Sequence, residues 1–311
     1  MGSEAGVSAV LRIVWVLVAA CWANWVVAAP ASGTIRAVAS FSILGDLVRE
    51  VGGDHVAVST LVGPGSDVHS FSPAPGNART LAQADIVFVN GLGLEGWIDR
   101  LIRASGTRAP VVTVSAGVRT IEGIEPHGHE GQEDHAADPH AWQNVANVKV
   151  YVANIRDGLA KVDPAHAADY AAAAAAYTAR IDALDRDVRA ALERIPPQNR
   201  RIITTHDAFG YFGAAYDLKI LAPQGVSTES EASPRDIAAI IDQIRREHVP
   251  AVFLETVTDP RQMERIARES GARIGGKVFS DALSEAGGPA PTYIDMIRAN
   301  VNAFAAALSP R

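Results

Sequence analysis

Short apolar runs rich in β-branched residues alternate with helix-like segments along most of this chain. Continuous apolar strands separated by helices are typical of parallel sheets that are buried on both faces. The pattern predicts an α/β fold of two similar lobes, each a four-stranded, mostly parallel sheet flanked by helices. The predicted strands lie at residues 35–39, 56–62, 85–89 and 111–114 in the first half and at 201–204, 218–221, 251–254 and 277–279 in the second.

One long helix is predicted between the two halves. Residues 163–194 are rich in alanine, and the paired prolines Pro196 and Pro197 follow them. Asp163 before Pro164 is a favourable helix start, and the paired prolines end the helix. At about 1.5 Å per residue, the helix would be about 45 Å long. The predicted organisation is a first lobe at 32–162, a linker helix at 163–195 and a second lobe at 196–311.

The first 31 residues are predicted to be a secretory signal peptide. Residues 7–29 are almost entirely apolar and small residues follow, which favours a cleaved signal over a retained membrane anchor. Cys21 is the only cysteine, and the residues before it resemble the lipobox of bacterial lipoproteins. The apolar sequence after Cys21 favours ordinary cleavage after Ala29 or Ala31. We expect a periplasmic or otherwise extracytoplasmic protein, with lipid anchoring at Cys21 as the alternative.

Charge and cysteine content limit the chemistry that the chain can perform. A formal net charge of −7 provides no basic face for phosphates, so no nucleic-acid partner is expected. Removal of the signal peptide would leave the mature chain without a thiolate. Any metal site would then have to use nitrogen and oxygen ligands.

Four short segments each present one potential metal ligand. His206 and Asp281 follow predicted strands, and His69 follows a strand and a Gly-Pro-Gly turn. Ligand sites in open α/β sheets form beyond the carboxyl ends of the strands, so both lobes would point their residues into one cleft. Three imidazoles and a carboxylate suit a first-row divalent ion, zinc above all. The four candidates are His69, His140, His206 and Asp281.

These segments resemble the metal-binding receptors of bacterial zinc and manganese ABC importers, the cluster A-I solute-binding proteins. The resemblance extends from about residue 35 to the C-terminus, although Val68 replaces a proline that is common in the family. Two further segments, at residues 90–95 and 227–234, also fit the family. The four ligand motifs are Ser66–Pro73, Asp138–Trp142, Thr205–Phe212 and Ser280–Leu283.

The resemblance implies a receptor that is not an enzyme. It implies a metal site between the lobes, held by the four candidate ligands, and a single rigid linker helix that limits hinge motion. Manganese members tend to carry glutamate at the third ligand position, so His206 favours Zn²⁺, with Mn²⁺ as the second choice. The expected partner is the membrane permease of an ABC importer. A metallochaperone is left open as a second partner, and the chain is expected to be a monomer.

Other polar residues are candidates for supporting roles. Glu255 ends a predicted strand and is a candidate for orienting a ligand imidazole, as are Asp67, Asp138 and Asp207, which could instead cap turns. Residues 123–137 are predicted to form a mobile acidic loop. It resembles the His-rich loop of zinc-specific members and would offer a low-affinity metal site. Its histidines are His127, His129 and His135.

Three alternative functions are compatible with the same residues. A manganese or iron receptor of the same family would use the same ligands. A zinc hydrolase would use the three histidines to hold the ion and Asp281 or Glu255 as the general base. A metal-dependent adhesin could share the fold.

Overall fold

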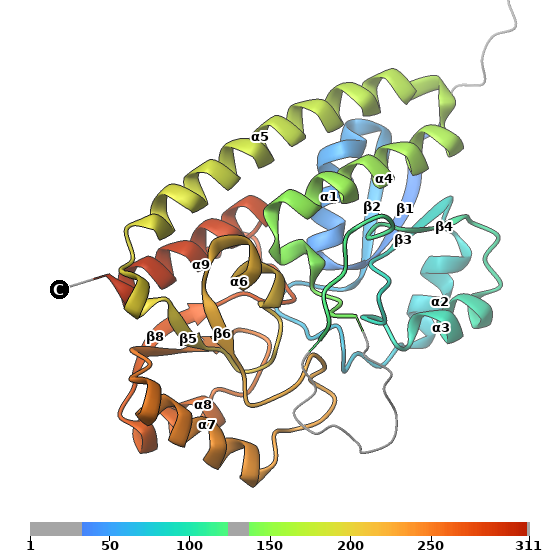
Figure 1. Cartoon of the computed structure of the whole chain (residues 1–311). Coiled ribbons are helices and arrows are strands. Elements are labelled where there is room, and N and C mark those ends of the chain that lie inside the picture. The colour runs from blue at the N-terminus through green and yellow to red at the C-terminus, as the bar shows by residue number, and fades with distance from the viewer. Residues whose placement is uncertain (1–32, 124–136, 310–311) are drawn as a thin grey trace, which may run out of the picture. The chain divides into compact units, whose positions relative to one another are not determined.

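The computed structural model describes residues 33–123 and 137–309, and all structural statements refer to these residues. It contains two parallel four-stranded sheets, which confirms the predicted two-lobe α/β fold (Figure 1). The first sheet has the order β2-β1-β3-β4 and the second the equivalent order β6-β5-β7-β8. The strands are β1 (Ile35–Phe41), β2 (Val56–Val62), β3 (Ile86–Val89), β4 (Val111–Thr113), β5 (Arg201–Ile203), β6 (Lys219–Leu221), β7 (Ala251–Glu255) and β8 (Arg273–Val278).

Helices connect the strands and cover the sheets. Because each crossover returns to a parallel strand, the strands of a lobe end at the same edge of its sheet. The helices are α1 (Ser42–Gly52), α2 (Pro75–Ala82), α3 (Ile98–Ser105), α4 (Val148–Val162), α6 (Gly210–Tyr216), α7 (Pro234–Glu247), α8 (Arg261–Ser270) and α9 (Tyr293–Leu308). Short 3-10 turns lie at η1 (Gly53–His55), η2 (Ala141–Gln143), η3 (Val145–Asn147), η4 (Pro164–His166) and η5 (Pro197–Asn199).

The long helix α5 (Ala167–Glu193) connects the first sheet to the second. It begins after Pro164, because the residues from Pro164 to His166 form the 3-10 turn η4. Its buried side chains recur every three or four residues, which produces one apolar stripe. This stripe packs against α1 and α4 of the first lobe and against α9 of the second (Figure 1). The buried residues are Tyr170, Ala174, Tyr177, Ile181, Leu184, Val188 and Leu192.

The main hydrophobic core includes side chains from both lobes. Phe41 at the end of β1 packs on Trp142, with ring centroids 5.1 Å apart. Tyr293 at the start of α9 belongs to the same cluster and donates a hydrogen bond from its hydroxyl to the carbonyl of Trp142 (2.7 Å). A smaller cluster, which includes Ile203 and Met263, lies where α7 and α8 pack on the second sheet. The lobes are therefore packed together near the strand ends.

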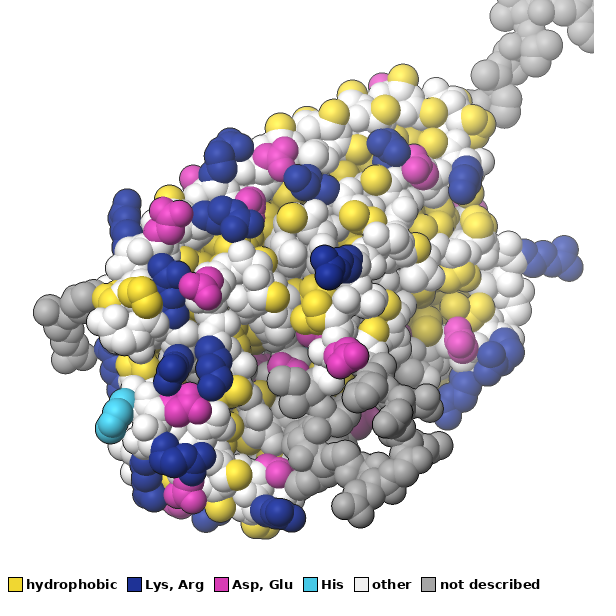
Figure 2. All heavy atoms as spheres, viewed as in Figure 1, with side chains coloured by type: hydrophobic (Ala, Val, Ile, Leu, Met, Phe, Trp, Pro, Cys, Tyr) yellow, Lys and Arg dark blue, Asp and Glu magenta, His cyan; other side chains and the backbone are white. Residues whose placement is uncertain are grey.

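On the face seen in Figure 2, acidic and basic side chains are interspersed with one another. None of the helices within residues 33–123 and 137–309 combines the length and the apolar character needed to cross a membrane.

We predict that Gly213→Ala destabilises the protein. Gly213 lies in α6, and a Cβ atom there would lie 2.7 Å from the backbone carbonyl of Leu218. The Leu218 carbonyl is part of the backbone and cannot move aside as the end of a flexible side chain would. We therefore expect a loss of about 1–3 kcal/mol in the free energy of unfolding. Thermal unfolding followed by circular dichroism would measure it. Gly96→Ala is the matched control, because a Cβ atom at Gly96 meets nothing within 4 Å. Equal melting temperatures for the two variants would contradict the prediction.

Candidate metal centre

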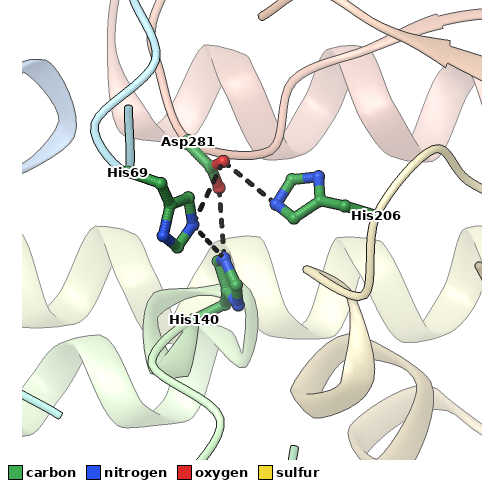
Figure 3. Close-up of side chains that lie close together, drawn as sticks. All are labelled: His69, His140, His206 and Asp281. Atoms are coloured by element: carbon green, nitrogen blue, oxygen red, sulfur yellow. Dashed lines mark hydrogen bonds and ion pairs between the residues drawn. The ribbon is translucent and has the colours of Figure 1, made fainter. Parts of the chain in front are cut away.

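Four side chains from separate segments of the chain meet between the two lobes. His69 lies in the loop after β2, His140 directly precedes η2, His206 follows β5, and Asp281 follows β8. Figure 3 shows their side chains pointing toward one another. All four side chains are buried, and one ligand atom of each lies within 4.8 Å of the others. These are the four residues that the sequence predicts as ligands.

The distances between the four side chains suit a single small cation. The Nε2 atoms of His69 and His140 are 3.2 Å apart, and His206 Nε2 lies 3.1 Å from Asp281 Oδ2. Asp281 also lies 3.5 Å from His140 Nε2 and 3.8 Å from His69 Nε2. A tetrahedral ion with bonds of about 2.0–2.1 Å has ligand atoms about 3.3 Å apart. The cluster therefore has the spacing of a four-ligand centre.

Three of the converging atoms have no hydrogen-bond partner among the described residues. They are His206 Nε2 and both carboxylate oxygens of Asp281, and all three are buried. An unsatisfied buried polar atom is unfavourable, and most such atoms in proteins are paired. A cation bound between them would satisfy all three together. This observation on its own supports a metal-binding role for the cluster.

Glu255 orients the imidazole of His206. The ring Nδ1 lies 2.5 Å from Glu255 Oε2, and the other oxygen of Glu255 accepts hydrogen bonds from the backbone N–H groups of Thr205 (2.7 Å) and His206 (3.0 Å). A carboxylate at Nδ1 keeps the ring N–H on that side and leaves the Nε2 lone pair for a metal. Glu255 ends β7, so the strand itself places it.

Asp138 orients His140 in the same way. Asp138 Oδ1 lies 2.8 Å from His140 Nδ1 and accepts a hydrogen bond from the His140 backbone N–H (2.9 Å). The Tyr211 hydroxyl of the second lobe donates to the Asp138 carbonyl (3.0 Å). Sequence proximity alone placed Asp138 among the candidates.

The two other flanking aspartates have different surroundings. Asp67 accepts a hydrogen bond from the His69 backbone N–H (2.8 Å) and contacts the Thr228 hydroxyl of the second lobe at 2.5 Å. It also accepts a hydrogen bond from the Ser70 hydroxyl (2.9 Å), so Asp67 contacts its own loop and the opposite lobe. Asp207 is buried next to His206, and its backbone N–H donates to the carbonyl of Gly225 (3.1 Å).

The loop that carries Asp281 is hydrogen-bonded to the first lobe. The Ser280 carbonyl accepts from Trp142 Nε1 (3.0 Å) and Gln143 Nε2 (2.9 Å). The Leu283 backbone N–H donates to the Ser42 hydroxyl (3.0 Å), and the Leu283 carbonyl accepts from the Gly65 N–H (2.9 Å). Sequence reasoning missed these contacts. Trp142 could have indicated one of them, because it belongs to the His140 motif.

A buried carboxylate network supports the segment before His140. Glu95 accepts hydrogen bonds from the Ser40 hydroxyl (2.6 Å) and from the backbone N–H groups of Asn90 (2.7 Å) and Gly91 (3.2 Å). Burial raises the pKa of Glu95, against the effect of these donors. Asn90 Nδ2 in turn donates to the carbonyl of Pro139 (2.9 Å). The family-like segment at 90–95 thus positions the His140 motif, a role that the sequence did not reveal.

Burial and charge give the ligands different protonation states in the metal-free protein. Burial lowers the pKa of His69 to about 4, so this ring is neutral near pH 7. For His206, burial acts against the charged form, but the carboxylates of Glu255 and Asp281 outweigh it and raise the pKa. Burial would raise the pKa of Asp281, but the three surrounding imidazoles hold it well below its usual range. Without metal, the centre therefore contains an Asp281 carboxylate beside a protonated His206.

Some residues predicted to be functional lie outside the described part of the chain. They are the histidines of the 123–137 loop (His127, His129 and His135) and the segment before residue 33, which includes Cys21.

Comparison with known proteins finds one family that covers most of the chain. Residues 37–307 match the family described as zinc-uptake complex component A, periplasmic. The chain is 34% identical over 302 residues to the manganese-binding lipoprotein MntA of Halalkalibacterium halodurans, a match that covers 97% of this chain and 98% of that protein. It is 33% identical over 270 residues to the iron-binding protein YfeA of Yersinia pestis, which covers 87% of this chain and 85% of that protein.

A solved structure has the same fold. It is the periplasmic zinc-binding protein TroA from Treponema pallidum, with a TM-score of 0.83 and 30% sequence identity. The alignment covers 89% of this chain and all of that one. The named metals of these relatives thus include manganese, iron and zinc.

We predict that filling the centre releases a proton at neutral pH. The raised pKa of His206 keeps its ring protonated in the metal-free protein, and a metal needs the Nε2 lone pair. Metal affinity should therefore rise as the pH increases toward the pKa of His206. His69, with its pKa of about 4, should not contribute a proton between pH 5 and 7. Isothermal titration calorimetry in buffers of different ionisation enthalpy would count the protons released.

Glu255→Gln is the companion variant for this measurement. Removing the carboxylate charge lowers the pKa of His206, so the variant should release less than the wild-type number of protons. A proton count of zero in the wild type, or an unchanged count in Glu255→Gln, would contradict this account of the site.

Proposed function

This chain belongs to the zinc-uptake complex component A family, whose members are the substrate-binding receptors of metal ABC importers, and we propose that it captures Zn²⁺ for delivery to a membrane permease. Membership makes it a metal-binding receptor and not an enzyme. The metal is therefore the cargo of the protein. A permease is the partner that this class of importer requires.

The donor set supports zinc as the cargo. Three imidazole nitrogens and one carboxylate converge with the spacing of a tetrahedral centre. Tetrahedral coordination by nitrogen-rich ligands suits zinc, whereas manganese prefers oxygen ligands in six-coordinate sites. His206 is the residue on which the choice depends, because a carboxylate at its position would make the site harder.

Manganese or iron is the second candidate cargo. Relatives that match nearly the whole chain are named as manganese-binding and iron-binding proteins. Both Asp281 oxygens lie near ligand nitrogens and have no hydrogen-bond partner among the described residues, so contact of both oxygens with the ion would raise the coordination number beyond four. A higher coordination number would suit these metals better than zinc.

The location of the receptor follows from its role. We propose that it acts as a monomer outside the cytoplasm after loss of the signal peptide at residues 1–31. The supporting evidence is the apolar N-terminal segment and the periplasmic description of the matched family.

Metal analysis would test the cargo directly. The protein purified without chelator or added metal should contain about one zinc ion per chain by inductively coupled plasma mass spectrometry. Predominant manganese or iron would overturn the argument from His206 and leave the receptor class intact. Absence of metal even after reconstitution would contradict the shared centre.

We predict that His206→Ala lowers zinc affinity more than about 100-fold, because it removes a ligand whose own positioning partners typically affect affinity 10–100-fold. A competition titration against a chelator would measure the loss. The metal-free fold should remain nearly intact, as judged by circular dichroism. His248→Asn is the control, since His248 is exposed at the end of α7 and lies outside the centre. Equal affinity for the His206→Ala variant and the control would remove His206 from the site.

His206→Glu tests selectivity at the same position. A second carboxylate makes the donor set harder, so the ratio of zinc to manganese affinity should fall relative to the wild type. An unchanged ratio would show that His206 does not set the preference.

A further inference from the structure

A cavity of about 360 Å³ lies next to two of the segments that carry metal ligands. Asp67, on its wall, is two residues before the ligand His69. Thr205, also on its wall, directly precedes the ligand His206. Thr205 is buried, whereas Glu231 on the same wall is exposed. The cavity therefore extends from the surface to the segments that hold these two ligands.

The charge on the wall of the cavity favours a cation. Asp67, Glu231 and Asp259 line it, and Arg261 lines it as well and is paired with Asp259. The carboxylates outnumber the guanidinium, so the wall is negatively charged. A cleft with an excess of one charge raises the local concentration of ions of the opposite sign. The cavity is therefore a suitable route for a cation between the solvent and the metal centre.

A hydrogen bond between two side chains crosses from lobe to lobe at this cavity. The Thr228 hydroxyl of the second lobe donates to Asp67 Oδ2 of the first (2.5 Å). Both residues line the cavity, and both are half-buried, so their contact lies between the buried centre and the surface. Thr228 belongs to the family-like segment at 227–234, to which the metal centre itself gives no role.

Each partner of this hydrogen bond is attached to a segment that carries a ligand. Asp67 Oδ1 accepts a hydrogen bond from the backbone N–H of His69 (2.8 Å). Gln224 forms a parallel β-bridge with His206, and its side-chain amide donates to the carbonyl of Thr228 (3.3 Å). The Thr228–Asp67 contact therefore joins the His69 segment to the His206 segment through the protein alone.

Asp67 does not need Thr228 to cap its own loop. Besides the His69 N–H, it accepts a hydrogen bond from the Ser70 hydroxyl at Oδ2 (2.9 Å). Short contacts of this kind are sufficient for an aspartate that stabilises a turn. The Thr228 hydroxyl is an additional donor from the opposite lobe, which a local turn does not require.

We propose that the Thr228–Asp67 hydrogen bond is a latch that controls how fast the cargo ion enters and leaves the metal centre through this cavity. The inference rests on the proposed function, because it requires the centre to bind a metal, but it does not depend on which metal is bound. Hydrogen bonds to a carboxylate are stronger than those between neutral groups, so loss of the latch should change an opening rate measurably. Neither side chain is a ligand, so the latch acts on the passage of the ion and not on its coordination.

The kinetics of zinc exchange in Thr228→Val would test the latch. Valine has nearly the shape of threonine but lacks the hydroxyl, so zinc uptake and zinc release should both become about tenfold faster. Because the two rates rise together, the affinity should change much less than either rate. An excess of a chromogenic chelator would measure release, and stopped-flow mixing with a zinc-sensitive dye would measure uptake.

Thr228→Ser and Thr258→Val are the matched controls. Serine retains the hydroxyl, so Thr228→Ser should exchange zinc at the wild-type rates. Thr258 also lines the cavity, but its hydroxyl contacts Thr205 Oγ1 (3.3 Å) and the Glu255 carbonyl (3.4 Å) within the second lobe. Thr258→Val should therefore match the wild type as well. Circular dichroism would show that the variants are folded.

The same measurements separate failure of the latch from failure of the proposed function. Wild-type exchange rates in Thr228→Val, or equal acceleration in Thr258→Val, would overturn the latch. Faster release with unchanged uptake would also overturn it, because the contact would then position His69 instead of controlling passage. All of these results would leave the proposed function intact, since metal would still be bound. A wild-type protein that binds no metal would contradict the proposed function, and the latch with it.

Discussion

The buried carboxylate of Asp281 is the group on which the metal centre depends. A charge removed from water is strongly destabilising unless it is paired, and the hydrogen bonds of this loop go to the Ser280 and Leu283 backbone instead of the Asp281 side chain. In the metal-free protein, the protonated ring of His206 is its closest counter-charge, 3.1 Å away. A divalent cation would replace that proton and neutralise the carboxylate more fully. Metal binding and the electrostatic stability of the closed site are therefore linked.

Hydrogen bonds around the centre fix the positions of the other ligands. Glu255 and Asp138 each fix one imidazole at Nδ1, so that Nε2 of His206 and of His140 points to the same place. The loop that carries Asp281 is bound by Trp142, the last residue of the His140 motif. Ligands from the two lobes are thus connected to each other through the protein as well as through any bound ion. A change in lobe packing would alter the metal geometry directly.

Burial and ring direction distinguish the metal centre from another group of histidines in the described residues. In the centre, buried carboxylates contact histidines that are themselves buried, which suits tight binding of cargo. Asp163 contacts Nδ1 of His166 in the same way, but His55 and Asp169 beside it are partly exposed. The rings of His55 and His166 are stacked, so their ring nitrogens do not converge on one point as those of the centre do.

The sequence by itself predicted the elements and the candidate ligands. Apolar runs and helix signals identified the two parallel sheets and the long helix, because these patterns arise from interactions between residues close together in the chain. The family-like motifs singled out His69, His140, His206 and Asp281. Tertiary structure alone decided that Asp138 and Glu255 contact the rings whereas Asp67 contacts Thr228, and that His55 meets His166. Asp138 and His140 are two residues apart, but the other contacts join segments that are distant in the sequence. They depend on how whole lobes and helices pack, which local sequence patterns do not encode.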